Sequence, residues 1–159
     1  MVKCFTGDKY LCEQALLKEL PENRDCINYL ESDKFDNEEY GFLFSISFLG
    51  GSKTLVFKTD MLDANETLLD ALSEDINNNL YIICRKLVKN RKISNKLKVM
   101  GVITELNVTP DMVLKIFNEF GTEHAEYIAK RIGLYEKQFM WVRLYHISVS
   151  YTHLRAHET

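Results

Sequence analysis

The chain has 159 residues, of which 46% are hydrophobic and 27% charged, and its formal net charge is −3. This is the composition of an ordinary globular protein of about one domain, and it excludes disorder as the main state. The four cysteines form no Cys-x-x-Cys pair, which argues against a cysteine metal centre, and no apolar run is long enough for a signal peptide or a membrane span. We therefore expect a cytoplasmic protein with reduced thiols and no metal or other cofactor.

The first half of the chain alternates short apolar runs with helical patterns. A strand is expected at residues 2–7, and the helix that follows at 8–20 is terminated by Pro21. A second strand is expected at 26–30 and a short helix at 38–46. The third strand, at 54–58, is rich in β-branched and aromatic residues.

The second half continues this alternation up to Leu106. A helix is expected at 62–76, and residues 79–84 form the continuous apolar run that is typical of a buried parallel strand. A weak helix at 93–100 and a fifth strand at 101–106 complete the pattern. Strands that alternate with helices predict an α/β fold, in which helices cover both faces of a parallel sheet.

The alternation of strand and helix patterns stops after Leu106, so we place a domain boundary there and assign residues 1–106 to the α/β domain. Thr109 and Pro110 have the pattern of a helix start, and two helical patterns follow, which predicts a partial helical domain over 107–147. Residues 148–159 resemble translated sequencing-adapter read-through. We expect this tail to be non-native and to have no part in the function.

The phosphate-binding chemistry expected of such a layout is missing from the sequence. The turn after the first strand carries Asp8 where a phosphate loop would have glycines and a lysine, and a carboxylate at that position repels phosphate. The strand at 79–84 runs into Arg85 and Lys86, which cannot hold magnesium. No Gly-x-Ser-x-Gly motif is present, and Cys4, Cys26 and Cys84 are expected to be buried structural thiols. The sequence therefore predicts no catalytic residues.

Positive charge is concentrated in one segment. Between Asp75 and Glu105 there is no acidic residue, whereas seven cations lie there: Arg85, Lys86, Lys89, Arg91, Lys92, Lys96 and Lys98. Such a run is usually a solvated helix face, and that is the interpretation the residues favour. The alternative is contact with nucleic acid, because lysine and arginine release counterions from a polyanion.

Phe48 and Leu49 are the pair of apolar residues that says most about a possible binding function. We expect them at the end of the short helix, directly before a Gly-Gly turn that leads into the third strand. Two such side chains at an exposed junction are suited to fill a hydrophobic groove on a partner protein. Burial of the pair beneath the sheet is the other interpretation, and the residues alone favour it.

Four segments in this order resemble the delta subunit of the bacterial DNA polymerase III clamp loader. The resemblance covers roughly residues 1–135, and its segments are 5–16 (FTGDKYLCEQAL), 47–57 (SFLGGSKTLVF), 79–87 (NLYIICRKL) and 101–106 (GVITEL). The first stands where a Walker A loop would lie. The second corresponds to the family's apolar pair, turn and strand, and the third to its strand followed by basic residues.

The resemblance implies an AAA+ fold without an ATPase site, followed by the start of a helical lid domain. It assigns contact with the ring-shaped sliding clamp to Ser47, Phe48 and Leu49. It also implies partners in the other clamp-loader subunits, and it makes primer-template DNA a candidate for the basic segment. Family members are about twice as long and end in a helical collar, so we expect a truncated chain. The few prolines and many Asn, Lys and Ile residues suit a phage or low-GC bacterial version, and the read-through tail suits a metagenomic source. The competing hypotheses are a stand-alone nucleic-acid-binding module that acts through residues 85–98, and an ATP-using enzyme with a divergent phosphate loop.

Overall fold

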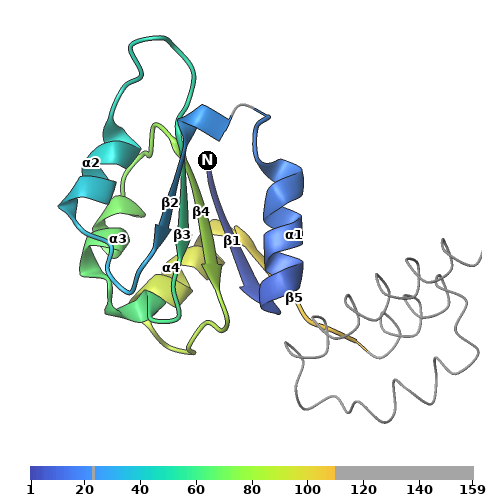
Figure 1. Cartoon of the computed structure of the whole chain (residues 1–159). Helices are drawn as coiled ribbons and strands as arrows, with labels where there is room; N and C mark the ends of the chain where they lie inside the picture. Colours follow the sequence, from blue (N-terminus) through green and yellow to red (C-terminus); the bar gives the residue numbers. More distant parts are fainter. Residues whose placement is uncertain (23, 110–159) are drawn as a thin grey trace, which may run out of the picture. The chain divides into compact units, whose positions relative to one another are not determined.

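The computed structural model describes residues 1–22 and 24–109, and it contains one five-stranded sheet. The strands are β1 (Val2–Gly7), β2 (Ile27–Glu31), β3 (Thr54–Lys58), β4 (Asn79–Cys84) and β5 (Ile103–Leu106). Their order is β2-β3-β4-β1-β5, and all neighbours are parallel (Figure 1). The predicted fold class is confirmed.

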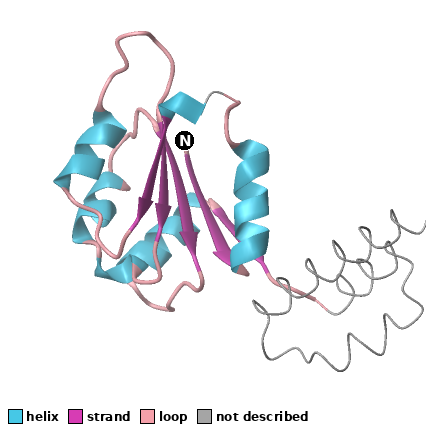
Figure 2. Ribbon diagram, viewed as in Figure 1, coloured by secondary structure: helices cyan, strands magenta, loops and turns pink. Residues whose placement is uncertain are grey.

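Helices cover both faces of this sheet (Figure 2). They are α1 (Lys9–Glu19), α2 (Asn37–Phe44), α3 (Glu66–Ala71) and α4 (Lys92–Met100), with 3-10 turns η1 (Arg24–Cys26) and η2 (Leu62–Ala64). The strand order explains their placement. The chain moves one way across the sheet from β1 to β2 and the other way in the later connections, and right-handed crossovers then put α1 on one face and α2, α3 and α4 on the other.

The core consists of two layers, one on each side of the sheet. On the α1 face, Phe5 of β1 and Tyr81 of β4 stack with their ring centroids 6.4 Å apart and pack with Leu16 of α1. On the opposite face, Phe57 and Leu80 pack against side chains of α2, α3 and α4. Successive residues of β3 and β4 are therefore buried on alternate faces, which is why these strands have continuous apolar sequences.

The cysteines differ in part from the prediction. Cys4, Cys12 and Cys84 are buried, and burial raises the pKa of the Cys12 thiol to about 11. Cys26 is exposed, so the prediction of a buried thiol is wrong there. It lies in η1, directly before β2, which is an edge strand of the sheet.

The chain divides into two compact units, Met1–Leu106 and Asn107–Thr159. The described residues end at Thr109. Nearly all of the predicted lid domain (107–147) and all of the predicted tail (148–159) therefore lie outside them. Within the described part of the chain, no helix is both long and apolar enough to cross a membrane. No group of three potential metal-ligating side chains occurs within the same residues.

Candidate functional site

The carboxyl ends of the strands form the crevice where doubly wound α/β folds usually bind ligands. A hollow of about 300 Å³ lies there. Its lining carries both signs of charge: three cations, Lys9, Lys58 and Arg85, lie among four carboxylates. Two of the cations are paired, since Lys58 Nζ lies 3.2 Å from Glu13 Oε1 and Arg85 Nε lies 3.8 Å from Asp60 Oδ1. The charges of this crevice therefore largely compensate one another instead of converging on an anion.

Asp8 begins helix α1 beside this crevice. Its Oδ1 accepts a hydrogen bond from the Leu11 N–H at 3.0 Å, so the predicted helix cap is present. Its Oδ2 is buried and has no hydrogen-bond partner among the described residues. The turn is tied to the neighbouring strands, because the Asp8 N–H donates to the Leu106 carbonyl at 2.7 Å and the Gly7 N–H donates to the Arg85 carbonyl at 3.1 Å. A carboxylate of the chain thus occupies the helix end where related folds place a phosphate.

Replacing Asp8 by asparagine is expected to stabilise the fold at neutral pH. Burial raises the pKa of the Asp8 carboxyl, an effect that the Leu11 and Tyr10 N–H groups offset only in part. A group with a raised native pKa stabilises the fold below its unfolded pKa, and this contribution is lost as the pH rises through the native pKa. Asparagine is an equally good N-cap and stays neutral.

Urea unfolding of both proteins at neutral and at acidic pH measures this effect. The Asp8→Asn variant should unfold at a higher urea concentration at neutral pH, and its advantage should shrink as the pH falls. A variant that is less stable than the parent at neutral pH would contradict the desolvation argument.

The loop between α2 and β3 projects at the opposite end of the sheet. Its Ser47 carbonyl accepts a hydrogen bond from the Gly50 N–H at 3.3 Å, which closes a four-residue turn with Phe48 and Leu49 at the centre. Gly50 and Gly51 follow with φ of 75° and 88°, the left-handed region that favours glycine. We call residues Ser47–Gly50 the apolar turn.

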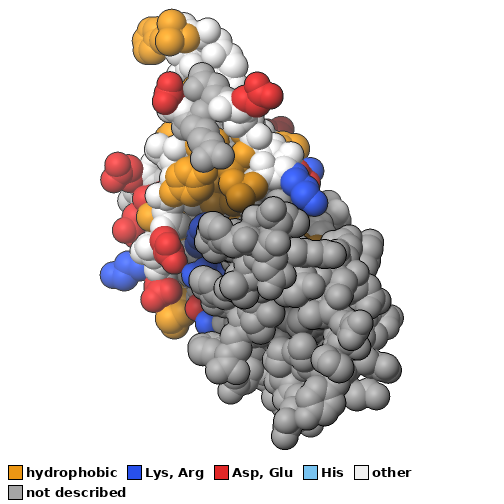
Figure 3. All heavy atoms as spheres, turned by 45° about the vertical axis from the view of Figure 1, so that its right-hand side comes forward, with side chains coloured by type: hydrophobic (Ala, Val, Ile, Leu, Met, Phe, Trp, Pro, Cys, Tyr) orange, Lys and Arg blue, Asp and Glu red, His pale blue; other side chains and the backbone are white. Residues whose placement is uncertain are grey.

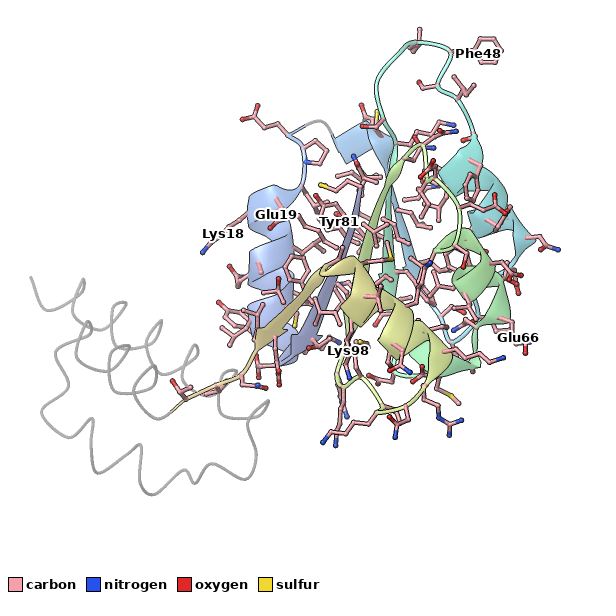
Figure 4. All side chains as sticks on the ribbon, turned by 180° about the vertical axis from the view of Figure 1, so that it is seen from behind. Lys18, Glu19, Phe48, Glu66, Tyr81 and Lys98 are labelled. Atoms are coloured by element: carbon pink, nitrogen blue, oxygen red, sulfur yellow. The ribbon has the colours of Figure 1, made fainter. Side chains whose placement is uncertain are left out.

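Both central side chains of the apolar turn are in solvent. Phe48 and Leu49 are fully exposed, with 107% and 99% of the reference accessibility of their residue types, and Ile46 beside them is 83% exposed. Phe48 is labelled at the tip of this loop in Figure 4, and apolar side chains gather at the same upper end in Figure 3. The interpretation that the pair packs beneath the sheet is therefore wrong.

The helix before this loop is shorter than predicted. It ends at Phe44, and the apolar pair lies in the loop rather than on the helix end. Ser45 has an extended conformation with ψ of 149°, and its Oγ donates to the Phe42 carbonyl at 2.8 Å. This local bond satisfies a carbonyl that another helical turn would otherwise have used. The pair is consequently carried on an extended segment away from the α2 surface.

The basic residues begin at the carboxyl end of the sheet, across from the apolar turn, and Lys96 and Lys98 lie on α4, which runs back toward the amino end of β5. They follow β4 through the loop at 85–91 and continue on α4, so they do not form one helix face. All except the half-buried Lys96 are exposed, and within the described residues only Arg85 has an ion-pair partner. Their positive charge is thus mostly uncompensated on the described surface.

Comparison with known proteins identifies the fold. No family model and no curated protein sequence matches the chain. Among solved structures, the DNA clamp loader delta protein of Bacillus subtilis matches with a TM-score of 0.60 and 13% sequence identity. The match covers 93% of this chain and 52% of that protein, so this chain spans about half its length. The chain therefore has a delta-like α/β fold.

Proposed function

We propose that this protein is a clamp-loader delta-like subunit that binds a DNA sliding clamp through Phe48 and Leu49. The observation that carries the proposal is the apolar turn, in which two large apolar side chains are held in water at the tip of a loop. Burying a Phe or Leu side chain is worth about 1.5–3 kcal/mol, so a partner that covers both side chains gains this free energy on binding. The fold that the chain shares with a clamp loader delta protein makes the sliding clamp the leading partner.

The apolar turn resembles a protein-binding anchor more than a ligand site. Its two side chains are consecutive residues at the centre of one turn, and the half-buried Ser47 closes that turn through its backbone. Such a projecting pair can enter a hydrophobic pocket, where a few buried anchors provide most of the binding energy. We expect other clamp-loader subunits to be further partners.

We propose that the subunit does not hydrolyse ATP. Support comes from the Asp8 carboxylate at the start of α1 and from the basic residues that directly follow β4. The test is thermal unfolding with and without magnesium and ATP. The melting temperature should not change, since a ligand stabilises only the state that binds it. A melting temperature that rises with ATP concentration would favour the enzyme hypothesis.

The function itself is tested by titrating the full chain onto an immobilised bacterial sliding clamp, for example that of Bacillus subtilis. Saturable binding that depends on Phe48 and Leu49 supports the proposal. Binding that is independent of both residues would reject the assigned contact.

The basic segment favours a second candidate function, nucleic-acid binding. Replacing Lys86, Lys89 and Arg91 by glutamine is expected to weaken binding to primer-template DNA. If each contacts a phosphate, the slope of log affinity against log salt should become shallower by about 0.9 per residue, or about 2.7 for the three.

A matched control for the DNA experiment is Lys18→Gln, which removes one exposed charge from α1 (Figure 4). This variant should leave the slope unchanged, and so should the loss of Phe48 and Leu49. Equal slopes for the triple variant and the parent would show that the segment is a solvated surface. DNA binding without any clamp binding would favour the stand-alone nucleic-acid module.

A further inference from the structure

Asn78 is a buried polar residue whose side chain reaches the loop that carries the apolar turn. It precedes β4, and only 2% of its surface is exposed. Its Nδ2 donates to the carbonyls of Phe42 at 2.8 Å and of Ser45 at 2.9 Å. The Leu43 carbonyl, at 3.2 Å from the same nitrogen, is a third acceptor for its two hydrogens. The amide therefore binds the point at which the chain leaves α2.

The other end of the same amide binds the point at which the chain enters β3. Asn78 Oδ1 accepts a hydrogen bond from the Lys53 N–H at 2.9 Å. Lys53 adds a second link across the loop, because its Nζ donates to Ser45 Oγ at 3.0 Å and lies 5.4 Å from the centre of the Phe42 ring. One side chain thus joins both ends of the loop, which are eight residues apart in sequence at Ser45 and Lys53.

We infer that Asn78 is a positioning residue for partner binding by the apolar turn, an inference that rests on the proposed function. It closes the base of the loop, so that Phe48 and Leu49 are presented in a defined position before the partner arrives. A loop that is already ordered loses less conformational entropy on binding and so binds more tightly. The position requires a donor and an acceptor in one short side chain, which aspartate and leucine do not provide.

Asn65 provides a matched control at the other end of the sheet. It is likewise buried, with 5% of its surface exposed, and its amide also bonds backbone groups of two segments. Its Oδ1 accepts from the Phe35 N–H at 2.8 Å, and its Nδ2 donates to the Met61 carbonyl at 3.1 Å. Asn65→Ala therefore removes a comparable set of hydrogen bonds without a described contact to the apolar turn.

The experiment is amide hydrogen exchange of the full chain, resolved by residue, in Asn78→Ala, Asn65→Ala and the parent. The informative amides are those of Ser45, Gly50 and Asn79, which bond to backbone carbonyls rather than to the Asn78 side chain. After correction for the change in global stability, we expect exchange at these amides to be about tenfold faster in Asn78→Ala and unchanged in Asn65→Ala. Ser45→Ala removes the hydroxyl that links the loop base to Lys53 and to the Phe42 carbonyl. It should have a smaller effect in the same direction, and it decides the question if Asn78→Ala does not fold.

Clamp affinity supplies the second readout. Asn78→Ala should bind an immobilised sliding clamp about tenfold more weakly than Asn65→Ala, a difference of about 1.4 kcal/mol. Unchanged exchange in both Asn78→Ala and Ser45→Ala overturns the inference, and so does faster exchange with full clamp affinity. If the parent binds no clamp, the proposed function fails. Faster exchange would then still identify the residue that orders the loop, and unchanged exchange would reject that role too.

Discussion

Replacing Phe48 and Leu49 together by alanine is expected to weaken sliding-clamp binding at least about thirtyfold, while the free energy of unfolding stays within about 0.5 kcal/mol of the parent. Two genuine anchors at the centre of an interface cost at least about 2 kcal/mol when both are truncated, which corresponds to that factor. Stability should hardly change, because both side chains are fully exposed in the free protein. Surface plasmon resonance and urea unfolding on the same preparations measure the two quantities.

Two exposed apolar residues outside the apolar turn serve as controls for this experiment. Ile46 is 83% exposed in the same loop, and Leu17 is 49% exposed on α1. Ile46→Ala should weaken clamp binding less than the double variant, and Leu17→Ala should leave it unchanged. If Leu17→Ala weakens binding as much as the double variant, general surface hydrophobicity explains the contact. Parental affinity in the double variant would falsify the assigned role of the pair.

The converse result is expected from a phenylalanine in the core. Phe57→Ala should lower the free energy of unfolding by about 3–5 kcal/mol, the usual cost of truncating a buried aromatic residue. Phe57 lies in the interior strand β3, is fully buried, and packs edge-on against Phe35 with ring centroids 5.4 Å apart. Domains of this size are stable by only about 5–15 kcal/mol, so the variant should lose a large part of its stability.

Urea unfolding followed by circular dichroism checks this expectation. The midpoint should fall by at least about 1 M, given slopes of about 1–3 kcal/mol per molar urea. Phe48→Ala is the matched control, because the same atoms are removed from an exposed position. A midpoint that falls equally in the two variants would mean that Phe48 is packed in solution, and would remove the basis of the proposed contact.

The central strands could be predicted residue by residue. The bounds of β3 and β4 agree with the expected 54–58 and 79–84, since burial on both faces selects an unbroken apolar run that the sequence displays directly. The expected helix at 62–76 is instead the turn η2 followed by α3. The Asn65 side chain interrupts it by binding the Met61 carbonyl and the distant Phe35 N–H, which apolar periodicity alone could not indicate.

The candidate site was predicted less completely than the fold. The sequence identifies Phe48 and Leu49 as a pair, but the residues alone favour their burial, whereas the structure leaves both exposed. Their exposure depends on Ser45, which ends α2 early, and their presentation on Asn78, which lies more than 30 residues away from the carbonyls it binds. Asn78 is the middle member of three consecutive asparagines, so nothing in the sequence distinguishes it from its neighbours.

The distance between the apolar turn and the basic segment has a physical consequence. The turn precedes the amino end of β3 and the cations follow the carboxyl end of β4, so roughly the length of a strand, about 16–20 Å, separates them. At physiological ionic strength the Debye length is about 8 Å, and charge at one end is therefore largely screened from the other. A protein partner at the apolar turn and a polyanion at the basic segment could therefore bind at the same time. Raising the salt concentration would then release the polyanion, whereas the apolar contact at the other end of the sheet would persist.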